Sequence, residues 1–403
     1  MISLCMSTID NAVNFTDCTT MPSNGDAQQD PRIIRALERS LELGETGIAV
    51  AAYYRGKKII DAVAGVANAE TGEKVTRDTL FPVFSVTKGV VALAVHLQAE
   101  RGLIDLNERI AKYWPAFGRN GKETITIEQA LSHRAGVPQM PKGVTPELMA
   151  NWEWMIKQIE SFTPIFPPGE ANAYHILVWG WIVGEVVRRT DPQHRPVEQF
   201  VYDEICKPIG AKNFFLGVPD TELQRVAKLS GGNDFVVQDD YGICPRAVFP
   251  GSEIHNTRIV QQGVDPGAGA ITTASAVAAI FGIVAGKGQF GGHQFLSPER
   301  VEAFAKFREG AYDQDKILPI PVWFGAAGYW LGGEPTASDP LVGDHREIVY
   351  SPGAGGSLAW ADFRKDLAVA ICHNNMDTPM ILEPERTYAP IVQAIREIVK
   401  DLE

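Results

Sequence analysis

The chain lacks the long apolar and basic segments that mark membrane and nucleic-acid-binding proteins. None of its 403 residues belongs to an apolar run of about eighteen, and the N-terminus has no basic segment followed by an apolar one. Lysine and arginine are not clustered, and the formal net charge of -12 is spread along the chain. We therefore expect a soluble, cytoplasmic protein with no membrane span and no nucleic-acid partner.

Cysteine and histidine are few, and neither residue type forms a recognisable site. The eight histidines show no H-x-x-x-H spacing, and the five cysteines include no C-x-x-C pair. This scatter predicts buried, reduced thiols rather than a disulfide framework, and it predicts no metal and no other cofactor. The five cysteines are Cys5, Cys18, Cys206, Cys244 and Cys372.

The composition is that of a large globular protein. With 45% apolar and 21% charged residues, the chain is long enough for two domains or one composite domain. Residues 1–30 are polar and irregular, and we interpret them as a loosely attached arm. A helix is predicted from Pro31 to Gly44, because proline suits the first helical turn and glycine a helix end. The folded part is therefore expected to begin near residue 31.

Strand patterns occur near both ends of the chain, and helical patterns lie between them. The strand-like runs cover residues 47–54, 58–67, 326–333, 356–363 and 366–374. The first two are joined by Arg55-Gly56-Lys57, which is typical of a hairpin, and the chain closes on an amphipathic helix over 389–403. We predict an α+β fold: one antiparallel sheet flanked by helices, built from residues 31–96 and 266–403, with a mainly helical domain inserted over 97–265.

The tetrapeptide Ser85-Val86-Thr87-Lys88 lies where a short strand-like run passes into a helical pattern. A spacing of three residues on a helix puts the serine hydroxyl and the lysine amine on one face, within reach of each other. The N-H groups and the positive dipole end at the helix N-terminus favour an alkoxide on Ser85 and a neutral amine on Lys88. The pattern predicts a nucleophile beside its base. The alternative is a helix-capping serine followed by a solvated lysine.

A serine nucleophile also needs a second proton-handling group and N-H donors for the oxyanion. Tyr174 precedes an apolar helical pattern and follows a Pro168-Gly169 turn, although a tyrosine in such a place is also typical of a buried core residue. The glycine-rich loop over residues 351–356 lets a substrate approach the backbone closely, although it is also compatible with a simple tight turn. No G-x-S-x-G motif is present, which disfavours an α/β-hydrolase.

Five segments follow, in order, the motifs of one enzyme superfamily. They are FSVTKGVVALAVHLQAERGLIDLNERIAKYWP, ITIEQALSHRAGVP, PGEANAYHI, GAGAITTASAVA and YSPGAGGSLAW. The chain resembles the serine β-lactamase/transpeptidase-like superfamily, specifically its class C β-lactamase and family VIII carboxylesterase branch, and the resemblance covers roughly residues 31–401. The resemblance implies that Ser85 is the nucleophile, Lys88 its base and Tyr174 the proton shuttle, with the N-H groups of Ser85 and Ala354 as the oxyanion hole.

Two positions depart from the β-lactamase pattern. Ile176 stands where those enzymes carry asparagine, and Ser351 stands where they carry the lysine of K-T-G. A β-lactam presents an amide and a carboxylate, and each charged hydrogen bond that is lost costs roughly 1.5–3 kcal/mol. We therefore predict poor β-lactam turnover and a preference for ester or acyl groups.

The residues expected to border the substrate are His175, Ile176, Ser351, Gly353 and Trp330. His175 is interpreted as a wall of the pocket, and neither it nor His133 is expected to act as a base. Trp330 is expected either to line an acyl pocket or to belong to the core.

These residues predict a serine hydrolase that forms an acyl-enzyme on Ser85 and passes the acyl group to water. The predicted substrate is a small-molecule ester, thioester or lactone. The nearest alternative is acyl transfer to an alcohol or amine, because the same acyl-enzyme serves both reactions. Further alternatives are a β-lactamase or DD-peptidase, and a catalytically silent binding protein. The sequence does not predict an oligomeric state.

Overall fold

The computed structural model describes residues 30–403 except 233–241, 309, 312, 321–322, 334–338, 340, 344 and 378–385. The predicted N-terminal arm, apart from its last residue, lies outside the described residues, as do Cys5 and Cys18. The other three cysteines are buried. No helix among the described residues is long and apolar enough to cross a membrane.

In the N-terminal hairpin the first strand has the predicted bounds, and the second extends one residue further at each end. Strand β1 (Gly47–Tyr54) pairs antiparallel with β2 (Lys57–Asn68), and Ala51 lies opposite Asp61. The two-residue turn takes both Arg55 and Gly56 into the left-handed region, with φ of 51° and 72°. Turns of this kind match the twist of the two strands, which explains why so short a connection suffices.

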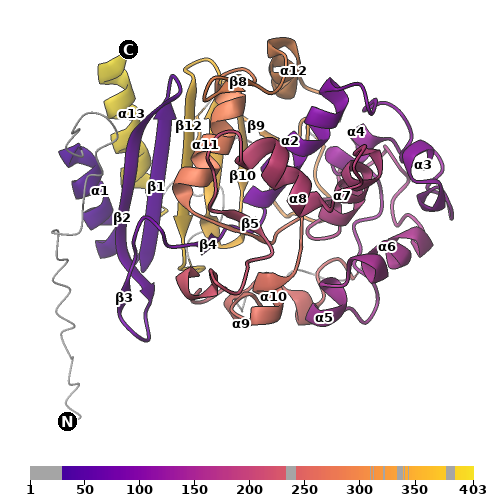
Figure 1. The fold of residues 1–403 in the computed structure, drawn as a ribbon, viewed down its shortest axis with the longest axis horizontal. Coiled ribbons are helices and arrows are strands. Elements are labelled where there is room, and N and C mark those ends of the chain that lie inside the picture. Colours follow the sequence, from indigo (N-terminus) through magenta and orange to yellow (C-terminus); the bar gives the residue numbers. More distant parts are fainter. Residues whose placement is uncertain are drawn as a thin grey trace, which may run out of the picture.

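A seven-stranded sheet forms the centre of the molecule (Figure 1). All of its pairs are antiparallel, and β12 lies between β1 and β11, so that strands from the two ends of the chain become neighbours. The strand order is β3-β2-β1-β12-β11-β10-β9. The remaining strands of this sheet are β3 (Glu73–Lys74), β9 (Trp330–Leu331), β10 (Ile348–Pro352), β11 (Leu358–Asp362) and β12 (Leu367–His373).

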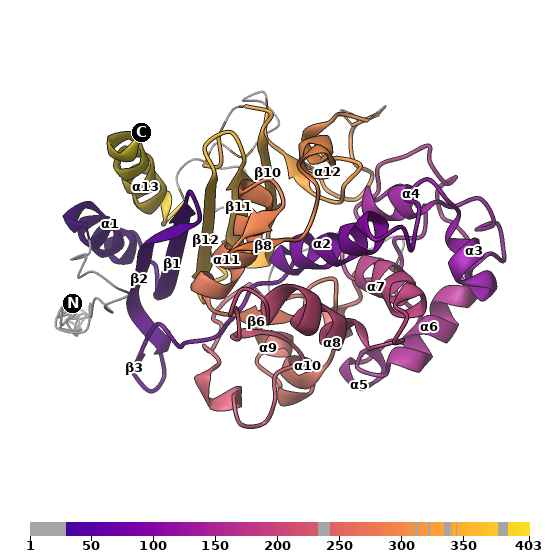
Figure 2. The ribbon, with the colours of Figure 1, turned by 45° about the horizontal axis from the view of Figure 1, so that its top comes forward.

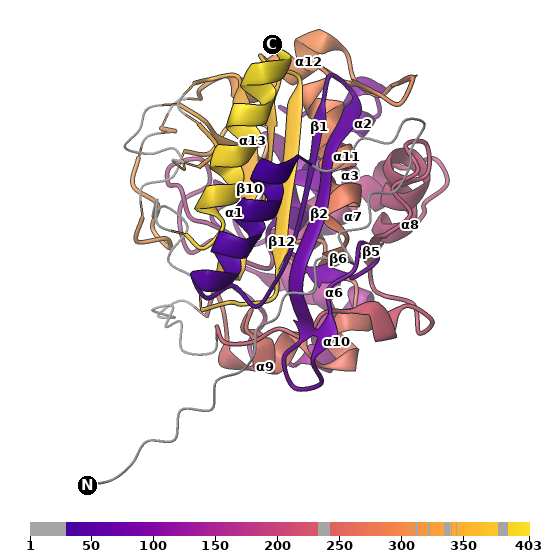
Figure 3. The ribbon, with the colours of Figure 1, turned by 90° about the vertical axis from the view of Figure 1, so that its left-hand side faces the viewer.

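Helices cover both faces of this sheet. On one face α1 (Pro31–Glu42) and α13 (Ala389–Leu402) lie side by side, as Figure 3 shows. On the other face α11 (Ala274–Ala285) packs against β1, β11 and β12, and α2 (Val86–Glu100) packs against β10. Almost every residue of α2 is buried, so this helix runs through the interior between the sheet and the remaining helices.

Most of the other helices gather on the far side of α2 from the sheet (Figure 2). A small sheet of β4 (Phe81–Pro82), β6 (Ala270–Thr272) and β5 (Phe214–Leu216) accompanies them. A second small sheet, of β7 (Gln289–Phe290) and β8 (His293–Gln294), lies instead beside α11, with α12 (Pro298–Glu302) next to it. The helices of the first group are α3 (Ile110–Tyr113), α4 (Ile127–Leu131), α5 (Pro146–Met149), α6 (Trp152–Ser161), α7 (Trp179–Thr190), α8 (Val197–Val201), α9 (Ser252–His255) and α10 (Arg258–Gln262).

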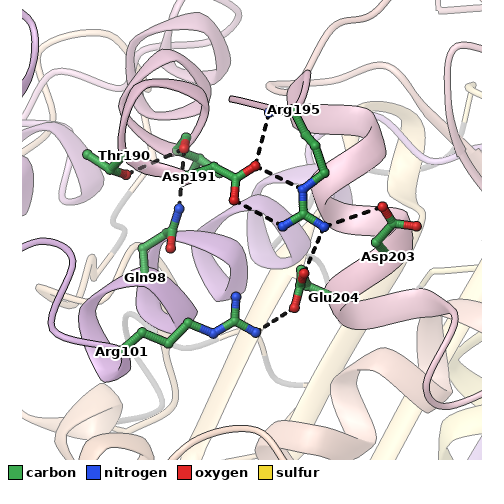
Figure 4. A network of polar contacts seen from close by, with 8 residues as sticks. Gln98, Arg101, Thr190, Asp191, Arg195, Asp203 and Glu204 are labelled. Carbon is green, nitrogen blue, oxygen red and sulfur yellow. Dashed lines mark hydrogen bonds and ion pairs between the residues drawn. The ribbon is translucent and has the colours of Figure 1, made fainter. Parts of the chain in front are cut away.

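An ion-pair network anchors the C-terminal end of α2 to this helical region (Figure 4). Arg195 contacts Asp191 through both Nε and Nη2, at 2.8 and 3.0 Å, and it also pairs with Asp203 and Glu204. Glu204 also forms an ion pair with Arg101, the residue that directly follows α2. Bidentate arginine contacts fix orientation as well as distance, so the network fixes one end of the helix whose other end carries Ser85.

The predicted α+β fold with its antiparallel sheet and flanking helices is confirmed. One strand prediction was too long, because only Trp330 and Leu331 of residues 326–333 are paired. Strand β10 was not predicted; its final residues, Ser351 and Pro352, belong to the sheet rather than to the glycine-rich loop. The division at residues 97 and 265 stays a prediction.

Candidate active site

Ser85 occupies the N-cap position of α2, directly after a strained residue. The backbone of Phe84 has φ of 47°, which is uncommon for a bulky side chain and costs on the order of 1–3 kcal/mol. Ser85 makes no capping hydrogen bond with its side chain, so the structure does not support the alternative of a simple helix-capping serine. Its side chain is instead part of the lining of a cavity of about 170 Å³.

Lys88 lies beneath Ser85 and is almost completely buried. Its Nζ is 3.0 Å from Ser85 Oγ, and it donates to the carbonyl oxygens of Ile176 and Gly267 at 2.7 and 2.8 Å. Burial lowers the pKa of Lys88 to about 7, and the charge of Asp265 opposes part of this shift. With two of its directions occupied by carbonyls, a neutral amine presents its lone pair to the Ser85 hydroxyl. The lysine is therefore not the solvated side chain of the alternative interpretation.

Asp265 is a site residue that the sequence analysis missed. Its Oδ1 accepts the N-H groups of Gly267 and Ala268 at 2.7 and 3.1 Å, which holds the Gly267 carbonyl toward Lys88. Burial raises the pKa of Asp265 to about 6, although these N-H groups and Lys88 oppose the shift. The only signal in the sequence is a turn-forming Asp-Pro-Gly, and nothing in it points to a lysine far away along the chain.

Tyr174 lines the cavity together with Ser85, and its ring lies 5.0 Å from Lys88 Nζ. Burial raises the pKa of Tyr174 far above its usual value, hydrogen bonding with Ser85 opposes this shift, and Asp315 adds to it. Tyr174 is therefore a phenol and a hydrogen-bond donor at neutral pH.

Two buried groups hold the backbone around Tyr174. The main chain of His133 accepts the Ala173 N-H at 3.1 Å, and its Nδ1 accepts the His175 N-H at 3.1 Å. Asp315 Oδ1 accepts the Tyr174 N-H itself at 3.2 Å. His133 therefore bonds loop backbone, as expected, and burial keeps its pKa well below the usual value. Asp315 is the second residue that the sequence analysis missed.

The glycine-rich loop forms part of the cavity wall. A single 3-10 turn, Ala354–Gly356, follows β10, and the Gly356 N-H donates to the Gly353 carbonyl at 3.0 Å. Gly355 has φ of 79°, a conformation that glycine adopts without strain. Within the described part of the chain, neither the Ser85 N-H nor the Ala354 N-H donates to an acceptor. Both are available to a substrate oxygen in the cavity.

The five expected substrate-binding residues divide into two groups. Ile176 and Trp330 line the cavity, whereas His175, Ser351 and Gly353 do not. His175 is fully buried, and its Nδ1 lies 2.6 Å from the Ala173 carbonyl. Ser351 is buried against α2, and Gly353 lies so close to the backbone of residue 83 that a Cβ would clash there.

The rest of the cavity wall is apolar. None of the lining residues that the structure describes carries a charged side chain. They are Phe84, Ser85, Tyr174, Ile176, Leu177, Gly232, Cys244, Phe249, Pro250, Ala268, Leu318, Pro319, Ile320, Trp330, Pro352, Ala354, Gly355, Gly356 and Met376. The described residues also contain no group of three His, Cys, Asp or Glu side chains suited to a metal ion.

Comparisons with known proteins give one consistent family. A family model for beta-lactamases matches residues 32–392. The chain is 27% identical over 367 residues to the esterase/beta-lactamase LipL of Mycobacterium tuberculosis, covering 87% of this chain and 82% of LipL. The crystal structure of a family VIII carboxylesterase has a TM-score of 0.81 at 28% identity, over 92% of this chain and 98% of that one. A penicillin-binding protein homologue from Caulobacter crescentus has a TM-score of 0.80 at 26% identity, with the same two coverages.

The match to the family model extends over both ends of the chain and so includes the sheet and the helical region. The predicted resemblance is therefore confirmed. This chain belongs to the beta-lactamase family, within the serine β-lactamase/transpeptidase-like superfamily, and it is an esterase-like serine hydrolase.

Proposed function

We propose that this enzyme hydrolyses neutral carboxylic esters or thioesters through an acyl-enzyme on Ser85. The observation that carries the proposal is the meeting of Ser85, Lys88 and Tyr174 at the end of an apolar cavity. A nucleophile, a base with a pKa of about 7 and a neutral phenol are the groups that acyl transfer needs.

The contacts suggest an order of proton transfers. Ser85 Oγ attacks the acyl carbon while its proton passes to the neutral amine of Lys88. The oxygen that becomes negative is bound by the N-H groups of Ser85 and Ala354. When the tetrahedral intermediate collapses, the leaving alkoxide receives a proton from the Tyr174 hydroxyl, which Lys88 reprotonates. Water then attacks the acyl-enzyme, and the same groups return the proton to Ser85.

The cavity wall supports a neutral substrate. A carboxylate placed there would lose its hydration without gaining a cation, which costs several kcal/mol. A cavity of about 150 Å³ holds a benzene ring, so a volume of about 170 Å³ suits an aryl group or a short alkyl chain. Two relatives are named as esterases, which supports an ester substrate, although the name of LipL also includes beta-lactamase.

Acyl transfer to an alcohol is the second candidate, and the apolar lining supports it. Such a wall holds little ordered water, so an apolar alcohol competes better for the acyl-enzyme than it would in an open site. Adding alcohols to the ester assay separates the two reactions, because hydrolysis gives only the acid and transfer gives a new ester.

The test of the proposal is turnover of p-nitrophenyl butyrate by Ser85→Ala. We expect turnover and labelling by a fluorophosphonate to be lost together, with an unchanged melting temperature. Ser40→Ala is the control, because Ser40 is a buried serine that does not line the cavity and donates to the Ala36 carbonyl in α1. Residual activity of Ser85→Ala within tenfold of the wild type would overturn the proposal.

A further inference from the structure

The glycine-rich loop is tied to a residue on the opposite side of the sheet from Ser85. The hydroxyl of Tyr388, which directly precedes α13, donates to the Gly356 carbonyl at 2.7 Å. Tyr388 is fully buried among the residues of the α1 and α13 layer, and it does not line the cavity. The loop that carries the Ala354 N-H is therefore held from outside the site.

Tyr388 is itself held by an ion pair. Arg386 Nη1 donates to the Tyr388 hydroxyl at 3.0 Å, and Arg386 Nη2 pairs with Asp339. Both members of the ion pair are at most 1% exposed. Because the hydroxyl accepts from Arg386, its own proton is directed at the Gly356 carbonyl.

A buried ion pair at this place needs a reason other than stability. Well-packed apolar residues of similar size are often as stable or more stable, because two charges lose their hydration on burial. The pair lies behind the sheet, yet it ends on the backbone of the cavity loop. What it provides is orientation of one carbonyl group.

The loop needs such orientation because two of its residues have no side chain that could hold their backbone in place. Gly355 and Gly356 have φ of 79° and 116° and no side chains that could fix their peptide planes. The Gly356 N-H donates to the Gly353 carbonyl at 3.0 Å, and the Gly353 N-H donates to the Ser357 carbonyl at 2.6 Å. The Gly353 carbonyl shares its peptide plane with the Ala354 N-H. A rotation at Gly356 that displaces its N-H would therefore release the plane that carries the Ala354 N-H.

We propose that Tyr388 is a positioning residue that aims the Ala354 N-H into the cavity by fixing the Gly356 carbonyl. This inference rests on the proposed function, because it assigns the Ala354 N-H to the negative oxygen of the transition state. Removing one oxyanion donor outright costs about 10²–10³ in rate, so misaiming one is expected to cost less.

The test compares Tyr388→Phe with Tyr350→Phe. Both remove one hydroxyl from a buried tyrosine of the same layer. The Tyr350 hydroxyl accepts from the Asp339 N-H at 3.3 Å and, among the residues that the structure describes, forms no hydrogen bond with the loop. We expect Tyr388→Phe to lower kcat/KM for p-nitrophenyl butyrate about 10–100-fold. Its affinity for phenylboronic acid, which mimics the tetrahedral state, should fall by the same factor, while benzamide binding and the pH profile stay unchanged. Tyr350→Phe should leave all of these values near those of the wild type.

Three results would overturn the inference: wild-type kcat/KM in Tyr388→Phe, an equal loss in Tyr350→Phe, or a rate loss without a matching loss of boronate affinity. If Tyr388→Phe does not fold, Arg386→Lys takes its place. Arg386→Lys should lower kcat/KM and phenylboronic acid affinity by the same, smaller factor. A loss of kcat/KM without an equal loss of boronate affinity would again overturn the inference. Failure of the proposed function would be seen in a different experiment, as ester turnover by Ser85→Ala.

Discussion

The two ends of helix α2 carry two polar clusters that use charge in opposite ways. At the C-terminal end, Arg195 and Arg101 pair with carboxylates, and the pKa of Arg195 is raised, chiefly by its hydrogen bond with Asp191. At the N-terminal end, Lys88 contacts a hydroxyl and two carbonyls, and burial lowers its pKa to about 7.

The difference teaches which cations are suited to chemistry. An arginine that faces carboxylates keeps its proton at every ordinary pH and can only hold structure. A cation surrounded by neutral acceptors in a dry site loses its proton near neutral pH and can act as a base. The same helix therefore carries a structural end and a reactive end.

The largest expected effect is the loss of activity when the Lys88 amine is removed from the N-terminal end of α2. Lys88→Met keeps the volume but has no base, so we expect kcat to fall about 10²–10⁴-fold. Arg101→Met removes a cation at the structural end and should leave kcat within twofold. Steady-state kinetics on one ester measures both. Equal losses in the two variants would remove the distinction between the ends.

The next prediction concerns the coupling of Lys88 and Tyr174. Tyr174→Phe alone should lower kcat on the order of a hundredfold. The double variant should lose little more than the worse single variant, because both groups handle the same proton. A double-mutant cycle measures this, and a loss equal to the product of the single losses would mean that the two act independently.

The cavity should discriminate against charged substrates. With no charged lining residue in the described chain, nitrocefin should react more slowly than p-nitrophenyl butyrate, because its carboxylate has no cation to pair with. Comparing kcat/KM for the two substrates tests this. Equal or faster turnover of nitrocefin would replace the esterase proposal with a β-lactamase one.

The pH profile tests the charge around Lys88. Since the free base must be neutral, kcat/KM should rise with pH through about 7. Asp265→Asn retains the acceptor oxygen but removes a negative charge that raises the lysine pKa, so the acidic limb should move to lower pH. An unmoved limb, or one moved to higher pH, would show that Asp265 does not act on Lys88 through its charge.

The smallest functional effect is expected at the structural end. Arg195→Met leaves the buried Asp191 carboxylate without its bidentate partner, which costs roughly 1–3 kcal/mol. The melting temperature should fall by a few degrees, while kcat/KM measured well below melting should stay unchanged. Thermal unfolding and ester kinetics on the same sample check this, and lost activity without lost stability would contradict it.

The sequence predicted features whose cause is local. The hairpin turn, the terminal helix and the position of Lys88 one turn after Ser85 depend on neighbouring residues, and the structure has all three. The catalytic roles of these residues stay predictions. Asp265 and Asp315 could not be found, because each reaches the site across long stretches of chain and acts on backbone N-H groups.

Ser351 is a residue whose expected contact with the substrate could not be judged from the sequence alone. Its position in the motif suggested contact with substrate, but strand register decides where a side chain points. As part of β10 it pairs with Ala359, and it is buried against α2 instead of lining the cavity. No local pattern in the sequence revealed that the strand extends this far.

The most direct test of the central claim is to trap the acyl group on the enzyme. Acid quench of wild-type enzyme with p-nitrophenyl butyrate, followed by trypsin and mass spectrometry, should place the butyryl mass on the peptide of residues 78–88, at its only serine, Ser85. Lys88→Met, in which the corresponding tryptic peptide extends to Arg101 because the cleavage site at residue 88 is lost, should give less acylation in the same time. Turnover with no butyryl adduct at any quench time, or an adduct on another peptide, would contradict the account.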